Sequence, residues 1–190
     1  MKIFFYKYGS ICEPDISDSF RRLGFEVIDE DMEIYNKNLL PSQCVETVSK
    51  KLIDGQFTFV FTINFFPWLS DLCEIMHLKY ISLIVDSPVL ELYSYSLKND
   101  CNRIFLFDRC LYNEFEPFNQ GHIFHVPLAA DVNRIQNVIK NASTSEKAKF
   151  ASDISFIGST YQEKCPFNRS ELNDADRGFT DGIMKKQTKD

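Results

Sequence analysis

Small polar residues and carboxylates follow several short apolar runs of the sequence, at the points where predicted strands end. These positions are Gly9-Ser10, Asp29-Glu30-Asp31, Asn64, Asp86-Ser87 and Asp108-Arg109. Open parallel sheets bind ligands outside the carboxyl ends of their strands. Such side chains hydrogen-bond hydroxyl groups, and one carboxylate can act as a general base. We therefore predict a ligand site at this edge, with Asp86 as the catalytic carboxylate and a binding set of Gly9, Ser10, Asn64, Ser87, Asp108 and Arg109.

The same residue types also cap helices. Asp86 or Ser87 before Pro88, and Asp108 before Arg109, fit the preference for Asp and Ser at a helix N-cap. The Gly9-Ser10 dipeptide fits an ordinary strand-to-helix turn as well as a ligand-binding loop. Capping and ligand binding are compatible, so both interpretations stay open at the level of the sequence.

Sequence motifs for nucleotides and metals are absent. The turn from Tyr8 to Pro14 lacks the GxGxxG pattern of dinucleotide-binding proteins, and no GxxxxGK[ST] loop occurs. The three histidines, His77, His122 and His125, form neither an HExxH motif nor a Cys/His cluster. A catalytic triad cannot be read from spacing, and there is no GxSxG elbow to indicate one. We predict no metal and no cofactor.

The elements that must position the polar residues are strands and helices in alternation. Most of the apolar runs are continuous, as in strands that are covered on both faces. The predicted strands are Ile3–Tyr6, Phe25–Ile28, Phe57–Ile63, Ile81–Val85, Ile104–Phe107 and Ile123–Val126.

Three helical patterns separate these runs, and each follows a proline, which is favoured in the first turn of a helix. Their apolar stripes are Val45, Val48 and Leu52; Leu69, Leu72, Cys73 and Met76; and Leu90, Tyr93 and Leu97. This order predicts an α/β fold with a Rossmann-like, mainly parallel sheet of six or seven strands and helices on both faces.

The composition disfavours several classes of protein. The 190 residues carry 21 Lys+Arg and 27 Asp+Glu, a net charge of −6, which disfavours a general nucleic-acid partner. No apolar stretch is long enough to span a membrane, and Met1–Tyr8 is too short for a signal peptide. The six cysteines include no CxxC pair and are typical of reduced thiols, so we expect a cytoplasmic protein.

The composition changes near the C-terminal end. A last apolar run, Ile154–Gly158, has the pattern of a further strand, and hydrophobic residues become sparse beyond Thr160. Leu172, Ala175, Phe179 and Ile183 still form a helical stripe. We therefore expect a Rossmann-like domain over residues 1–159, and a helical segment over 160–190 that leads into a second domain.

Several motifs together resemble one family. They are Asn64-Phe-Phe-Pro67, Val85-Asp-Ser-Pro88 with Leu92-Tyr-Ser94, Ile104–Arg109, His125–Asp131, and Asp153–Ser159 with Cys165-Pro166. In this order they resemble the N-terminal domain of CgeB-like (spore-maturation-type) glycosyltransferases, over about residues 55–185. The stretch before residue 55 fits two β-α units but carries no signature.

The resemblance implies the N-terminal half of a GT-B enzyme, whose two Rossmann-like domains face each other across a cleft. In such enzymes the N-terminal domain usually handles a sugar or other hydroxyl acceptor, and the C-terminal domain binds the nucleotide-sugar donor without a metal. Only about 30 residues follow the Asp153–Ser159 motif, so we expect the donor-binding domain to lie outside this sequence. We expect the chain to be inactive alone, because catalysis needs both substrates positioned together.

Two alternatives belong to other classes. The chain fits a non-catalytic Rossmann-like binding or interaction module, which would keep the fold without turnover. It fits an unrelated flavodoxin-like or receiver domain less well, because a receiver needs paired acids after its first strand, where this chain has Tyr8-Gly9-Ser10.

Overall fold

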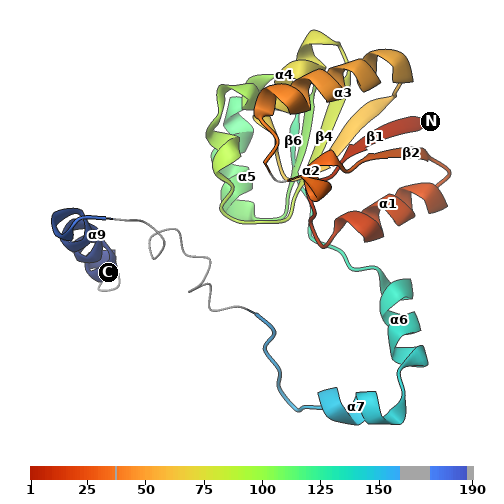
Figure 1. The fold of residues 1–190 in the computed structure, drawn as a ribbon, viewed down its shortest axis with the longest axis vertical. Coiled ribbons are helices and arrows are strands. Elements are labelled where there is room, and N and C mark those ends of the chain that lie inside the picture. Colours follow the sequence, from red (N-terminus) through yellow and green to blue (C-terminus); the bar gives the residue numbers. More distant parts are fainter. Residues whose placement is uncertain (37, 159–171, 188–190) are drawn as a thin grey trace. The chain divides into compact units, whose positions relative to one another are not determined.

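The computed structural model describes residues 1–36, 38–158 and 172–187. Its central element is a six-stranded parallel sheet with the order β2-β1-β3-β4-β5-β6 (Figure 1). The strands are β1 Lys2–Tyr6, β2 Glu26–Glu30, β3 Phe59–Ile63, β4 Lys79–Ile84, β5 Asn102–Leu106 and β6 Ile123–His125. The predicted α/β class and the parallel sheet are confirmed.

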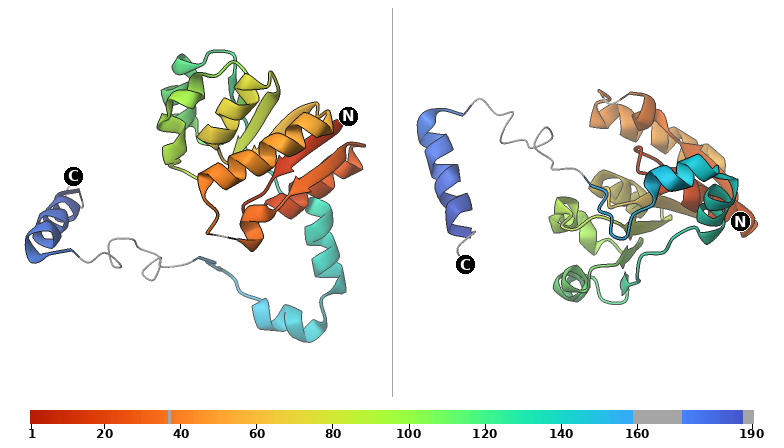
Figure 2. Two further views of the ribbon diagram at one scale, coloured as in Figure 1. Left: turned by 45° about the horizontal axis from the view of Figure 1, so that its top comes forward. Right: turned by 90° about the horizontal axis from the view of Figure 1, so that it is seen from below.

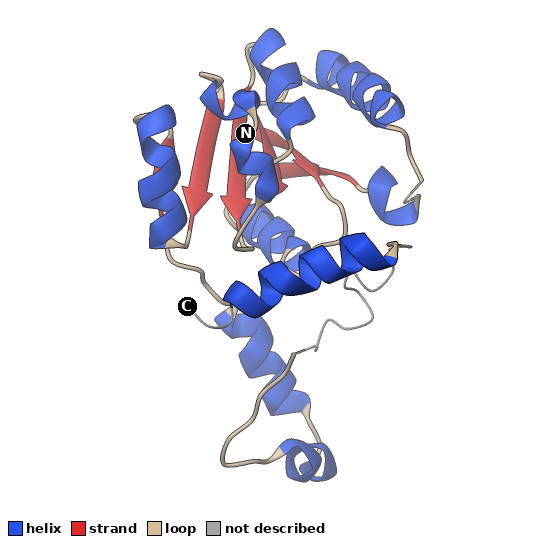
Figure 3. Cartoon of the chain, turned by 90° about the vertical axis from the view of Figure 1, so that its left-hand side faces the viewer, coloured by secondary structure: helices blue, strands red, loops and turns tan. Residues whose placement is uncertain are grey.

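Helices join the strands in the alternation expected of a Rossmann-like fold. They are α1 Glu13–Arg22, α2 Met32–Tyr35, α3 Pro41–Gly55, α4 Pro67–Ile75, η1 Leu90–Tyr93, η2 Tyr95–Lys98, α5 Arg109–Phe115 and η3 Glu116–Phe118. After the sheet come α6 Val132–Asn141, α7 Thr144–Phe150 and α9 Asp174–Gln187. Figure 3 shows neighbouring strands running in the same direction among the helices.

Alternate side chains of a strand point to opposite faces of the sheet, and helices bury both faces. Phe4 and Tyr6 of β1 belong to a large core that also contains residues of α3, α4 and α5. Phe5 of β1 belongs to a second, smaller core, to which α1 contributes Ile16 and Phe20. This double burial explains the continuous apolar runs of the strands.

The segment after Pro88 differs from its predicted α-helix. It forms two short 3-10 helices, η1 and η2, separated by Ser94 in an extended conformation. The side-chain amide of Asn102 donates hydrogen bonds to the carbonyl oxygens of Ser96 at 2.8 Å and Leu97 at 3.1 Å. Asn119 donates a further bond to the Leu97 oxygen at 2.8 Å. The carbonyl oxygens of Ser96 and Leu97, which a continuous α-helix would use for its own hydrogen bonds, are thus bound by the side chains of Asn102 and Asn119.

The seventh apolar run is not a strand. Ile154–Gly158 has no regular secondary structure, and Phe156 and Ile157 are 91% and 96% exposed. A strand needs a hydrogen-bonded neighbour, and no described residue pairs with this run. The sheet therefore has the smaller of the two predicted strand numbers.

The chain divides into two compact units, Met1–Asn137 and Val138–Asp190, and each is described by itself (Figure 2). The first contains the sheet and all the buried core residues of the described chain. The second contains α7 and α9, and Phe179 and Ile183 of the predicted stripe are exposed on α9. The predicted boundary at residue 159 and the Cys165-Pro166 motif lie outside the described residues. Among the described helices, none combines the length and apolarity needed to cross a membrane.

Candidate functional site

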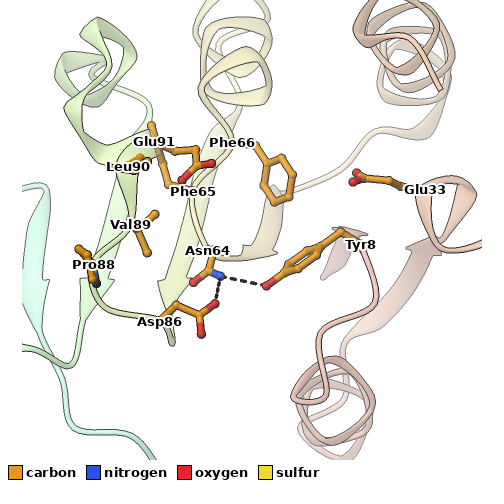
Figure 4. Close-up of a pocket in the computed structure, with 10 residues that line it drawn as sticks. All are labelled: Tyr8, Glu33, Asn64, Phe65, Phe66, Asp86, Pro88, Val89, Leu90 and Glu91. Carbon is orange, nitrogen blue, oxygen red and sulfur yellow. Dashed lines mark hydrogen bonds between the residues drawn. The ribbon is translucent and has the colours of Figure 1, made fainter. Parts of the chain in front are cut away.

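A pocket of about 480 Å³ lies at the carboxyl ends of β1, β3 and β4, the edge selected from the sequence (Figure 4). The register aligns Tyr6 with Thr62, and Ile63 with Leu83, so these strands end at one level. The segments that follow them therefore converge. The pocket is lined by Tyr8, Glu33, Asn64, Phe65, Phe66, Asp86, Pro88, Val89, Leu90 and Glu91.

Asn64 connects the three strand ends. Its backbone has a φ of 57°, in the left-handed region, which Asn tolerates better than most residues. Its side-chain amide donates hydrogen bonds to the Tyr8 hydroxyl at 2.9 Å and to Oδ2 of Asp86 at 2.6 Å. Its Oδ1 accepts the N–H of Val85 at 3.1 Å. The predicted pair Asn64 and Asp86 is thus in direct contact.

The Tyr8 hydroxyl is the polar end of an aromatic wall. Its ring lies 5.6 Å from that of Phe66, measured between centroids. Burial raises the pKa of Tyr8, and hydrogen bonds with the side chains of Ser10 and Asn64 oppose that rise. Tyr8 therefore stays a neutral hydroxyl that both donates and accepts hydrogen bonds at physiological pH.

Glu33 reaches the pocket from α2, and Figure 4 shows its carboxylate directed toward Phe66 and Tyr8. The buried Tyr6 hydroxyl donates a hydrogen bond of 2.6 Å to Glu33 Oε2. Burial, and then the bond to Glu33, raise the pKa of Tyr6, so this donor is neutral. The Tyr6 ring also packs edge-on against Phe66 at 5.3 Å, which links the carboxylate to the aromatic wall.

Ser87 and Asp108 form a second pair, outside the residues that line the pocket. The Ser87 hydroxyl donates to Asp108 Oδ2 at 2.6 Å, and the N–H of Cys110 donates to Asp108 Oδ1 at 2.7 Å. The bond from Ser87, followed by those from the backbone, lowers the pKa of Asp108. Asp108 thus caps α5, whereas Asp86 caps no helix, because η1 begins only at Leu90.

The Gly9-Ser10 turn is organised by Glu13, whose side chain is buried. Glu13 Oε1 accepts the N–H of Tyr8 at 2.8 Å, and both carboxylate oxygens accept the N–H of Gly9 at 3.1 and 3.2 Å. Ser10 contacts the site through its bond to Tyr8. Arg109 is exposed in the first turn of α5 and does not line the pocket.

The acidic residues after β2 hold the fold together. Asp29 accepts from Lys7 at 2.8 Å and from Ser17 at 3.0 Å, and it pairs with Arg21. The buried Glu30 pairs with Lys51 at 2.5 Å. Neither carboxylate lines the pocket.

Sequence reasoning missed Tyr8, Glu33 and Glu91 as pocket residues. Tyr8 follows β1 by two positions, so the strand-end rule that selected Gly9 and Ser10 could also have found it. Glu33 lies on α2, a four-residue helix after β2, and no local pattern indicates where its side chain points. Glu91 lies in η1, where the prediction was a longer helix.

A search for similar sequences found neither a protein-family model nor a curated protein that matches this chain.

Proposed function

We propose that this chain is the acceptor-binding domain of a GT-B-type glycosyltransferase, with Asp86 as the general base. The observation that carries the proposal is the pairing of Asp86 with Asn64 in a pocket at the strand edge, beside aromatic rings. The resemblance to CgeB-like enzymes supports the same assignment, because the Asn64–Pro67 and Val85–Pro88 motifs supply these residues.

The geometry suits proton removal from a hydroxyl group. Asn64 donates to Oδ2 of Asp86, which orients the carboxylate and leaves Oδ1 to accept a bond from the acceptor. A sugar hydroxyl is a poor nucleophile until its proton begins to leave. A positioned general base contributes typically about 10²–10⁴-fold to the rate of such a step.

The walls of the pocket suit a sugar ring. Phe65, Phe66, Val89 and Leu90 provide apolar surface, and Tyr8, Asn64 and Asp86 provide a small number of polar groups. Pockets that bind small molecules commonly combine these two kinds of lining. The aromatic faces can cover the C–H side of a sugar while the polar groups hydrogen-bond its hydroxyls.

The nucleotide-sugar donor requires a different surface. Its diphosphate needs cations or free N–H groups, and none of the ten lining residues is Lys, Arg or His. We therefore assign this pocket to the acceptor, and the donor to a second domain. This division also predicts that the 190-residue chain alone has no transferase activity.

The test uses Asp86→Asn in the protein that carries both domains. Asn keeps the size and one acceptor oxygen, but it cannot take a proton. We expect near-normal melting and acceptor affinity, together with a fall in kcat of at least about 10²-fold. Asp54→Asn, an exposed site on α3, is the matched control and keeps full turnover. Normal kcat in Asp86→Asn, together with normal melting, would disprove the catalytic role of Asp86.

A further inference from the structure

The lining of the pocket is acidic. Glu33, Asp86 and Glu91 reach it from α2, the loop after β4 and η1, and none of the ten residues that line it is basic. Within the part of the chain that the structure describes, none of the three forms an ion pair. The hydrogen-bond donors to Glu33 and Asp86 are a tyrosine hydroxyl and an amide, both neutral. Among the described residues, this negative charge therefore has no basic partner.

The same cavity has features that a cluster of acids alone would not have. Its lining includes the aromatic residues Tyr8, Phe65 and Phe66, and Glu33 is directed toward the Phe66 ring (Figure 4). An aromatic face attracts a cation when the charge lies within about 6 Å of the ring centre. A carboxylate and an aromatic face on one side of a cavity therefore favour the same kind of ligand.

The geometry also selects the kind of cation. Among the described residues, no three acidic, histidine or cysteine side chains come close enough together to hold a metal ion. Carboxylates that are spread around a cavity of about 480 Å³ suit an organic ammonium ion, which is larger than a metal ion. Such an ion also fills the apolar part of the pocket.

We propose that the acceptor carries a protonated amine beside its hydroxyl groups, as an amino sugar does. This inference rests on the proposed function and specifies its substrate class. The ammonium group lies between the Glu33 carboxylate and the Phe66 ring, and a hydroxyl group of the same molecule faces Asp86. Glu91 adds negative charge to the lining of the pocket.

The experiment compares three sugars with one ring and different groups at a single carbon. Glucosamine has an ammonium group, glucose has a hydroxyl and N-acetylglucosamine has a neutral amide. Binding to the 190-residue chain is measured by calorimetry, and by backbone amide NMR to locate the shifts at Asn64, Phe66 and Asp86. We expect glucosamine to bind at least about tenfold more tightly than glucose, which corresponds to about 1.4 kcal/mol.

The variant Glu33→Gln isolates the amine contact. Glutamine keeps the side-chain length and an oxygen that can accept the Tyr6 hydroxyl, so only the charge is lost. We expect this variant to bind glucosamine about as weakly as glucose. Glu46→Gln, on the exposed side of α3, changes the net charge equally and keeps the preference. Equal loss in both variants would overturn the inference, since it would indicate a general effect of net charge.

Each further outcome separates this inference from the proposed function. Equal affinity for all three sugars overturns the amine preference and leaves a hydroxyl acceptor in place. Binding of methylammonium without any of the sugars supports the cation site and contradicts the sugar acceptor. If neither the sugars nor methylammonium shift Asn64, Phe66 or Asp86, the inference is wrong.

Discussion

At the scale of single residues, Asn64 combines a backbone conformation with a set of hydrogen bonds. Its φ of 57° is unfavourable for a side chain without local polar partners, and its amide bonds to Tyr8, Asp86 and Val85. Asn64 therefore holds three strand ends in one arrangement. The two contributions can be separated by substitution.

Asn64→Gly and Asn64→Ala both remove the three side-chain contacts, but only alanine adds the strain of a Cβ atom in the left-handed region. We expect Asn64→Ala to be less stable than Asn64→Gly by about 1 kcal/mol, the typical cost of that conformation. Urea denaturation of both variants measures the difference. Equal stability would mean that the loop changes its backbone conformation when the amide is lost.

The role of Asp108 as the N-cap of α5 can be tested by substitution. In the variant Asp108→Asn, the new side chain would still accept the N–H of Cys110, because Asn caps helices about as well as Asp. Its amide nitrogen could not accept the Ser87 hydroxyl. We expect Asp108→Ala to lower the Tm more than Asp108→Asn, and Arg109→Ala to have little effect as the neighbouring control. Thermal melts followed by circular dichroism give the order, and equal Tm values for the two Asp108 variants would contradict the cap.

At the scale of elements, the 3-10 segment depends on Asn102, which is fully buried on β5. Its amide donates to Ser96 and Leu97, and its oxygen accepts the Ser70 hydroxyl at 2.7 Å. Asn102→Ala removes these three buried hydrogen bonds, each of which contributes about 0.5–1.5 kcal/mol to stability. We expect a loss of at least that size in chemical denaturation. Asn113→Ala, exposed on α5, is the control and should stay within about 0.5 kcal/mol of the parent.

The stability that Asp29 contributes to the contact between β2 and α1 depends on pH. Burial pushes the pKa of Asp29 upward, but hydrogen bonds from Lys7, Arg21 and Ser17 outweigh it and lower the pKa below 3.8. A folded-state pKa below the unfolded value gives stability that is present above the unfolded pKa and is lost as the pH falls through the folded one.

The variant Asp29→Asn should therefore be less stable than the parent at pH 7, and the difference should shrink in acid below about pH 4. Urea denaturation at a series of pH values from neutral down to about pH 3 measures this convergence. Asp54→Asn serves as the control, and it should differ little from the parent at each pH. A stability difference that did not change with pH would show that the Asp29 charge does not stabilise the fold.

Local pattern predicted the strands and the helices α3 and α4, because burial on both faces and proline at the first turn are signals within a few residues. It did not predict η1 and η2, because Asn102 and Asn119, which bind their carbonyls, lie after them in the sequence. The strand-end rule found Asn64 and Asp86. Glu33 was missed because its position depends on a bond to Tyr6, 27 residues away.

At the scale of the whole molecule, the core belongs to the first unit. Every buried residue of the described chain precedes Asn137, as do the ion pairs Arg22–Asp131 at 2.7 Å and Arg134–Asp15 at 2.8 Å. We expect a chain that ends at Asn137 to fold cooperatively. Its Tm should lie within about 4 °C of the parent's, which is the shift that 1 kcal/mol causes at this size.

Calorimetry of the shortened and full chains measures the Tm and the unfolding enthalpy. The same glucosamine titration can be repeated on the shortened chain, because the residues that line the pocket all precede Asn137. A shortened chain that does not fold would show that the residues after Asn137 contribute to the stability of the core.

The Glu13 carboxylate has a consequence for competition between ligands. Many Rossmann-like proteins hold a phosphate with the N–H groups of their first strand-to-helix turn. Here a buried side chain of the same turn, 2% exposed, already occupies the N–H groups of Tyr8 and Gly9. A tethered group acts at a local concentration of the order of millimolar or higher, whatever its intrinsic affinity. A free phosphate would have to displace the Glu13 carboxylate from these N–H groups. The carboxylate therefore competes with phosphate binding at this turn, and we expect ligands to bind at the neighbouring strand ends instead.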